Sequence, residues 1–169
     1  MRIAGKLAAG SLVVLCCLMA QAADSTKKLS PKQEQLKRDQ LRIAVQEICP
    51  VSGQKLGSHG KPIKVKAGKQ LTVFLCCKGC LKGKINPKHW ATIHGNIVKA
   101  QKICPVMKHK LSQKPKWTII QGQLVYYCCP PCTKKLAAQP TKYLRELDKL
   151  YQKSIDARKR VAKAKRRVR

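Results

Sequence analysis

Cysteines are the residues of this chain best suited to chemistry, and they recur in two copies of one pattern. Residues 49–51 read Cys-Pro-Val and are followed by Phe-Leu-Cys-Cys-Lys-Gly-Cys at 74–80. Residues 104–106 read Cys-Pro-Val and are followed by Tyr-Tyr-Cys-Cys-Pro-Pro-Cys at 126–132. A repeat period of about fifty residues predicts two copies of one small, sulfur-built module. The candidate site residues are Cys49, Cys76, Cys77, Cys80, Cys104, Cys128, Cys129 and Cys132.

Acidic residues are absent from the stretch that holds these cysteines. From Ile48 to Arg145 there is no Asp or Glu, whereas 19 Lys and Arg occupy the same stretch. This excludes carboxylate acid–base catalysis and an oxygen-rich calcium or magnesium site within the repeats. Cys, His and Met remain as ligands, and they suit zinc and copper. We therefore expect one zinc or copper ion per repeat and no enzymatic activity, since no nucleophile–base pair or phosphate loop is evident.

The ligand set within each repeat stays open at this point. Neighbouring side chains in a strand point to opposite faces, so Cys76 and Cys77 reach one metal only if the strand has turned by Cys77. Four cysteines per repeat complete a tetrahedral site, and three cysteines with one histidine are the variant. The candidates other than cysteine are His59, Met107 and His109. A methionine beside a histidine would favour copper(I) in the second repeat.

Two other uses of the thiols compete with metal binding. Secreted proteins commonly pair their cysteines in disulfides, although adjacent cysteines rarely bond each other. The Cys-x-x-Cys segments at 77–80 and 129–132 have the spacing of thioredoxin-type exchange sites, but no strand–helix–strand pattern surrounds them. The hypotheses are thus a metal-binding protein, a disulfide-stapled polycation and a thiol–disulfide carrier, in that order.

The first 22 residues have the features of a signal peptide. Arg2 and Lys6 precede an apolar run at 7–19 that is too short to cross a bilayer, and Ala-Gln-Ala at 20–22 is typical of a cleavage site. An uncleaved anchor is the alternative. In either case we expect the rest of the chain to be extracytoplasmic, either periplasmic or secreted.

A lead-in segment at 23–48 is predicted to contain one helix. The Ser-Pro-Lys-Gln sequence at 30–33 has the N-cap, first-turn proline and third-position glutamine of a capping box. Leu41, Val45 and Ile48 recur at helical spacing and form a stripe able to lie against the first repeat.

The first repeat, residues 49–99, is predicted to form a knuckle, a β-hairpin and a short helix. Alternation at 63–66 and an apolar return at 71–75 indicate the two strands of the hairpin, which ends at the cysteine pair. The short helix should begin at or after Cys80. The Asn-Pro sequence at 86–87 is expected to break the chain.

The second repeat, residues 100–150, has the same order in fewer residues. Its strands are predicted at 117–120 and 124–127, and a helical pattern begins at Thr141. Residues 151–169 are expected to form a basic C-terminal helix or tail.

Positive charge dominates the whole chain. It has 37 Lys and Arg against 7 Asp and Glu, a formal net charge of +30, and eight of the last twelve residues, Arg158–Arg169, are basic. Such a charge attracts anionic membrane surfaces and acidic polysaccharides. No DNA-reading helix pattern is evident, so no specific nucleic-acid partner is expected.

The order of these features resembles the YHS/TRASH class of heavy-metal-binding domains. Cys-Pro-Val, a hairpin, aromatic-x-Cys-Cys-x-x-Cys, a short helix and Pro-x-x-aromatic follow one another over about 49–99 and 104–150. The resemblance implies an α+β fold of two small Cys-rich, treble-clef-like units flanked by N- and C-terminal helices. In each unit a knuckle and the start of a helix would present thiols to one metal.

Two details of the motif bear on the ligands. The closing Phe-Cys-x-x-x-Cys motif of that family is matched by Cys76/Cys80 and by Cys128/Cys132. The knuckle cysteine of the family stands three residues after the place of Cys49, where this chain has Ser52 in the first copy and methionine in the second.

Overall fold

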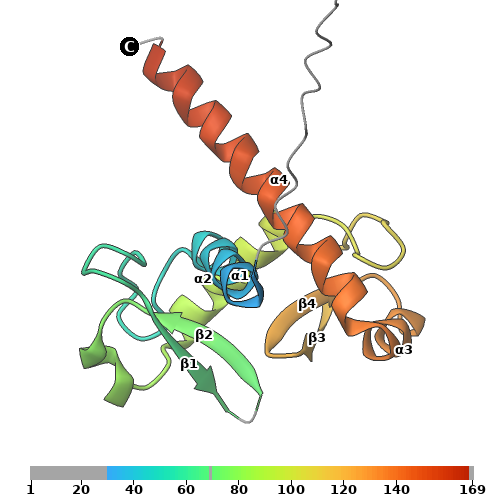
Figure 1. Cartoon of the computed structure of the whole chain (residues 1–169), viewed down its shortest axis with the longest axis horizontal. Coiled ribbons are helices and arrows are strands. Elements are labelled where there is room, and N and C mark those ends of the chain that lie inside the picture. The colour runs from blue at the N-terminus through green and yellow to red at the C-terminus, as the bar shows by residue number, and fades with distance from the viewer. Residues whose placement is uncertain (1–29, 69, 168–169) are drawn as a thin grey trace, which may run out of the picture.

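The computed structural model describes residues 30–68 and 70–167 as an α+β protein with two Cys-rich units, which confirms the predicted fold class (Figure 1). The predicted signal peptide lies outside these described residues. The elements are α1 (Pro31–Gln46), β1 (Ile63–Ala67), β2 (Leu71–Leu75), the 3₁₀ helix η1 (Lys78–Lys82), α2 (Pro87–Gln101), β3 (Lys116–Ile120), β4 (Gln123–Tyr127), α3 (Pro131–Ala138) and α4 (Pro140–Arg167).

The N-terminal helix α1 begins at the predicted capping box. The Ser30 hydroxyl accepts a hydrogen bond from the Gln33 backbone N–H at 3.3 Å, and the Ser30 N–H donates to the Gln33 side chain at 3.0 Å. Leu41 and Val45 are buried, but they pack in a cluster made by α2, α4 and the second repeat rather than against the first repeat alone. Ile43 of α1 packs on the apolar cluster of the first repeat.

The two predicted β-hairpins are confirmed, and each ends directly before its cysteine pair. Strands β1 and β2 are antiparallel, with Ile63 opposite Leu75, and β3 and β4 are antiparallel, with Lys116 opposite Tyr127. An isolated two-stranded hairpin is marginal in water. The two hairpins support each other, because the Thr72 N–H donates to the carbonyl of Gly122, in the turn of the second hairpin, at 2.9 Å.

Helix α2 joins the two repeats and was not predicted. The Asn-Pro pair expected to break the chain instead starts this helix: the Asn86 side chain accepts from the Lys88 N–H at 2.9 Å, and Pro87 occupies the first turn. Proline is well suited to that position because its missing N–H would have no partner there. The helix crosses the predicted boundary at 99/100, so it closes one repeat and opens the next.

The N-terminal half of helix α4 packs on the body of the protein, and its C-terminal half projects away from it. Its buried residues are Leu144, Leu147, Tyr151 and Ile155, and the apolar stripe ends there. The helix nevertheless continues to Arg167, and its C-terminal part projects from the body (Figure 1). None of the described helices is long and apolar enough to cross a bilayer.

Candidate metal centres

Each knuckle is a tight loop that fixes one cysteine at its start. In the first copy, the Cys49 N–H donates to the Gln54 carbonyl at 2.8 Å, and the Gly53 N–H donates to the Cys49 carbonyl at 3.0 Å. Short β-bridges close both loops, Ile48 with Lys55 and Ile103 with Lys110. The second copy repeats the cysteine bonds, since the Cys104 N–H donates to the His109 carbonyl at 2.8 Å.

Each knuckle cysteine meets two cysteines from beyond the hairpin. Two groups form, and within each the three Sγ atoms lie within 4.8 Å of one another: Cys49, Cys76 and Cys80 in the first, and Cys104, Cys128 and Cys132 in the second. All three residues of the first group are buried, as are two of the second. The groups use the predicted positions of the closing motif, and η1 and α3 supply the last cysteine of each.

The remaining cysteine of each copy lies at the edge of its group. The Sγ of Cys77 is 3.8 Å from the Sγ atoms of both Cys76 and Cys80. The Sγ of Cys129 is 3.8 Å from that of Cys128 and 3.1 Å from that of Cys132. Strand β2 ends at Leu75, so the chain has turned before Cys77. This turn is what Cys76 and Cys77 need in order to face the same site. Cys77 and Cys129 are only half-buried.

The sulfur spacing fits a tetrahedral thiolate site. A Zn–S bond of about 2.3 Å places the corners of a tetrahedron about 3.8 Å apart. The Sγ–Sγ distances are 3.6 Å for Cys76 to Cys80, 3.7 Å for Cys104 to Cys132 and 3.9 Å for Cys128 to Cys132. The other sulfur pairs within each triad lie within 4.8 Å, so each triad can close around one ion by small side-chain movements.

Backbone N–H groups favour the thiolate form of the two knuckle cysteines. Burial opposes ionisation of Cys49, but the N–H groups of Ser52, Cys76 and Val51 around its sulfur outweigh it and lower the pKa to about 6. The pKa of Cys104 is lowered in the same way, against the effect of burial. Hydrogen bonding to a charged group favours its charged form. Each site thus contains one sulfur prepared for a cation before any metal binds.

Three of the other cysteines show the opposite behaviour. Burial raises the pKa of Cys80 to about 12, and burial likewise raises the pKa values of Cys132 and Cys128. Gathered sulfurs in an apolar setting cannot all carry negative charge unless a cation balances them. Without a cation these three thiols are therefore protonated at neutral pH, and a bound cation would be needed for them to ionise together.

The candidates other than cysteine lie outside both groups. His59 and His109 are exposed, and neither belongs to a group of potential ligands among the described residues. Met107 is 41% exposed on the second knuckle. Ser52 does face the first site, because its Oγ lies 3.3 Å from the Sγ of Cys76.

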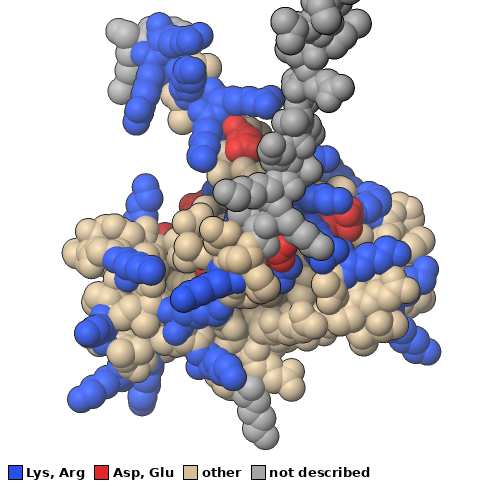
Figure 2. Space-filling view, in the orientation of Figure 1, with Lys and Arg blue, Asp and Glu red and all other residues tan. Residues whose placement is uncertain are grey.

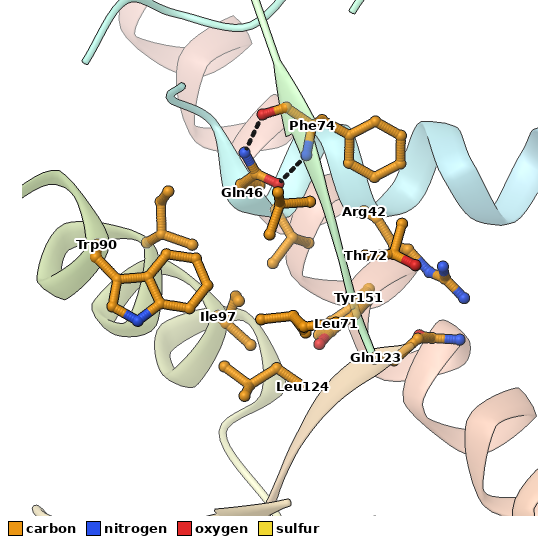
Figure 3. Close-up of a pocket in the computed structure, with 13 residues that line it drawn as sticks. Arg42, Gln46, Leu71, Thr72, Phe74, Trp90, Ile97, Gln123, Leu124 and Tyr151 are labelled. Carbon is orange, nitrogen blue, oxygen red and sulfur yellow. Dashed lines mark hydrogen bonds between the residues drawn. The ribbon is translucent and has the colours of Figure 1, made fainter. Parts of the chain in front are cut away.

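Sequence reasoning missed two glutamines that position the sites. The Gln46 side chain donates to the Phe74 carbonyl at 2.7 Å and accepts from the Phe74 N–H at 2.9 Å (Figure 3). Gln101 makes the same pair of bonds with Tyr126, at 2.6 Å and 3.0 Å. Each amide also donates to the carbonyl just before the knuckle cysteine. The repeated sequence Gln-x-Ile-Cys-Pro-Val at 46–51 and 101–106 could have identified them, because it extends the Cys-Pro-Val motif by three residues toward the N-terminus.

The eight described cysteines are all free thiols, with no pair at disulfide bonding distance. Comparison of the chain with models of known protein families, with curated proteins and with solved structures finds no match in any of the three.

Proposed function

We propose that this protein is a non-enzymatic, extracytoplasmic metal-binding protein that holds one soft metal ion, zinc or copper, in each of its two cysteine groups. The observation that carries the proposal is the duplicated triad of sulfurs at tetrahedral spacing, with a fourth thiol beside each triad. Cys77 and Cys129 complete four-sulfur sites in this proposal. Zinc suits four thiolates in a tetrahedron, and copper(I) is the soft alternative.

The exposure of the fourth thiol supports exchange of the ion with the surroundings. Three buried sulfurs in the first site retain the metal, while half-buried Cys77 offers an incoming ligand a route to it. Export is inferred from the leader sequence. Sequestration or transfer of metal is therefore favoured over a purely structural role.

Metal titration of single-cysteine variants tests the proposal. Wild-type protein should bind two cobalt(II) or zinc ions, with the sulfur-to-cobalt charge-transfer absorption of a thiolate site. Cys80→Ser and Cys132→Ser should each bind one ion, because each removes a buried ligand from one site. His59→Ala and His109→Ala are matched controls and should still bind two ions. Loss of an ion in a histidine variant, or two ions in both cysteine variants, would refute the ligand sets.

A further inference from the structure

The projecting end of α4 carries a dense positive charge that the metal sites do not use. Seven of the ten residues from Arg158 to Arg167 are Lys or Arg, and all ten are exposed. Figure 2 shows these basic side chains around the helix where it stands clear of the body. At its base, Arg158 forms an ion pair with Glu47 and donates to the Ala44 carbonyl at 3.2 Å, so the helix leaves the body at a fixed place.

A groove of about 660 Å³ lies where this helix leaves α2. Four cationic residues line it: Lys99 and Lys102 at the end of α2, and Arg158 and Lys165 on α4. The only carboxylate among its lining residues, Glu47, is already paired with Arg158. Within the described part of the chain, the three lysines have no ion-pair partner. The groove therefore holds uncompensated positive charge on both of the helices that form it.

The rest of the groove is small and non-aromatic. Its other lining residues are Asn96, Ala100, Ser154, Ala157, Val161 and Ala162. Sites for single-stranded nucleic acid stack bases on aromatic side chains, and none is present among these residues. Helices that lie in a membrane surface insert large apolar residues such as Trp, Phe and Leu. Alanines and one valine offer too little apolar area for that.

We propose that this groove is a binding site for a linear acidic polysaccharide, whose carboxylate or sulfate groups pair with the lysines of α2 and α4. The small uncharged residues leave room for the sugar rings between the cations. The remaining basic residues of α4 extend the site along the helix for further acidic sugar units. This binding would hold the protein on an acidic polymer independently of its metal sites.

Equilibrium binding of the full-length protein to heparin, followed by fluorescence anisotropy at low salt, tests the groove. Lys99→Gln with Lys102→Gln should weaken binding by about fivefold for each lysine, and roughly 25-fold together, from the usual contribution of a basic residue near a polyanion. The matched control, Lys134→Gln with Lys135→Gln, removes the same charge from exposed positions of α3 and should weaken binding by less than about threefold. Equal loss in both double variants would overturn the proposal, because it would show that total charge alone determines binding.

The same variants distinguish an acidic polysaccharide from single-stranded nucleic acid and from anionic membranes as the ligand of the groove. Binding to poly-dT and to phosphatidylglycerol vesicles should decrease equally for the groove variant and for the control. A groove-specific loss with poly-dT or with vesicles would overturn the assignment to a polysaccharide. Metal stoichiometry should stay at two ions in both double variants, which verifies that the protein is intact.

Discussion

At the scale of single residues, one glutamine beside each knuckle connects the end of a helix to the strand that delivers the cysteines. Gln46 bonds both backbone groups of Phe74, two residues before Cys76, and also the carbonyl before Cys49. It therefore fixes the knuckle and the strand end relative to each other. A buried side chain at 6% exposure with three hydrogen bonds acts as a rigid spacer within the site.

Replacement of this glutamine should damage both the fold and the metal site. Gln46→Leu leaves the Phe74 N–H and carbonyl buried without partners, which costs about 2–4 kcal/mol in the free energy of unfolding. Urea unfolding measures this loss, and metal titration should show weaker binding at the first site only. Gln54→Leu, at an exposed position on the same knuckle, is the matched control and should change neither quantity. Equal stability of the two variants would contradict this role.

The pKa of Cys49 makes the stability of the metal-free, reduced protein depend on pH. Its pKa in the folded protein is about 6, below the ordinary thiol value of 9.0. Between these values the unfolded chain binds a proton that the folded chain lacks, so the stability contribution of Cys49 increases as pH rises from about 6 to about 9 and is lost as pH falls toward 6.

Urea unfolding of the reduced, metal-free protein at pH 6 and pH 8.5 should show this gain. Cys49→Ser should show a smaller gain than wild type, while Cys104, whose pKa is also lowered, still contributes its own part. An identical pH dependence of wild type and Cys49→Ser would mean that the N–H groups around the sulfur do not stabilise its thiolate.

The sequence predicts the thiol clusters because the Cys-Pro-Val and Cys-Cys-x-x-Cys segments recur in the same order in both repeats. It does not predict which member of each vicinal pair is buried, since that depends on where the strand ends and the turn begins. The glutamines were missed for a different reason. A polar residue at a helix end usually faces solvent, and only the fold reveals that Gln46 and Gln101 point inward.

At the scale of secondary structure, the hairpins and the first helix follow from local signals, whereas α2 does not. Alternating strands and a capping box are fixed by neighbouring residues. An Asn-Pro pair can either end or begin a helix, and the downstream residues decide between the two. Ile93 and Ala100 are buried on one face of α2, and this packing across the molecule selects the helix.

The contact between the hairpins gives a prediction for the turn of the second one. Gly122 has φ +79, and a Cβ there would lie 2.7 Å from the Thr72 Oγ1. Gly68, in the turn of the first hairpin, has φ +61 but meets nothing within 4 Å. Both Gly→Ala changes strain the backbone by about 1 kcal/mol, and Gly122→Ala should cost about 1–2 kcal/mol more because the hairpins must separate.

Thermal or urea unfolding of the two variants measures that difference, with Gly68→Ala as the matched control. Adding Thr72→Ala to Gly122→Ala should recover part of the loss, since it removes the atom in conflict. Equal destabilisation by Gly68→Ala and Gly122→Ala would show that the hairpins do not depend on each other.

At the scale of the whole molecule, the two repeats share their interior unequally. One cluster consists of first-repeat residues and includes Cys49, Cys76 and Cys80. Another combines Cys104 and Cys132 with residues of both hairpins, including Leu71 and Val73 of the first. The first cysteine group therefore lies in a local cluster of its own repeat, whereas the second lies in a cluster shared by both repeats.

Removing a cysteine from the first group should therefore destabilise a smaller part of the protein than removing one from the second. Cys80→Ser should increase amide hydrogen exchange mainly in the first knuckle and η1, because its cluster is local. Cys132→Ser should increase exchange in both hairpins and in α3, because its cluster spans both repeats. Segment-resolved hydrogen exchange measures this, and equal, repeat-confined effects of the two variants would show that the repeats are independent modules.

Native mass spectrometry of the full-length protein, before and after treatment with a strong chelator, tests the central claim most directly. We expect two bound metal ions per chain, with zinc or copper masses, and loss of both ions after chelation. A metal-free species whose mass is lower by eight hydrogens, with its folded charge states unchanged by chelator, would contradict it, because the eight cysteines would then be paired in disulfides.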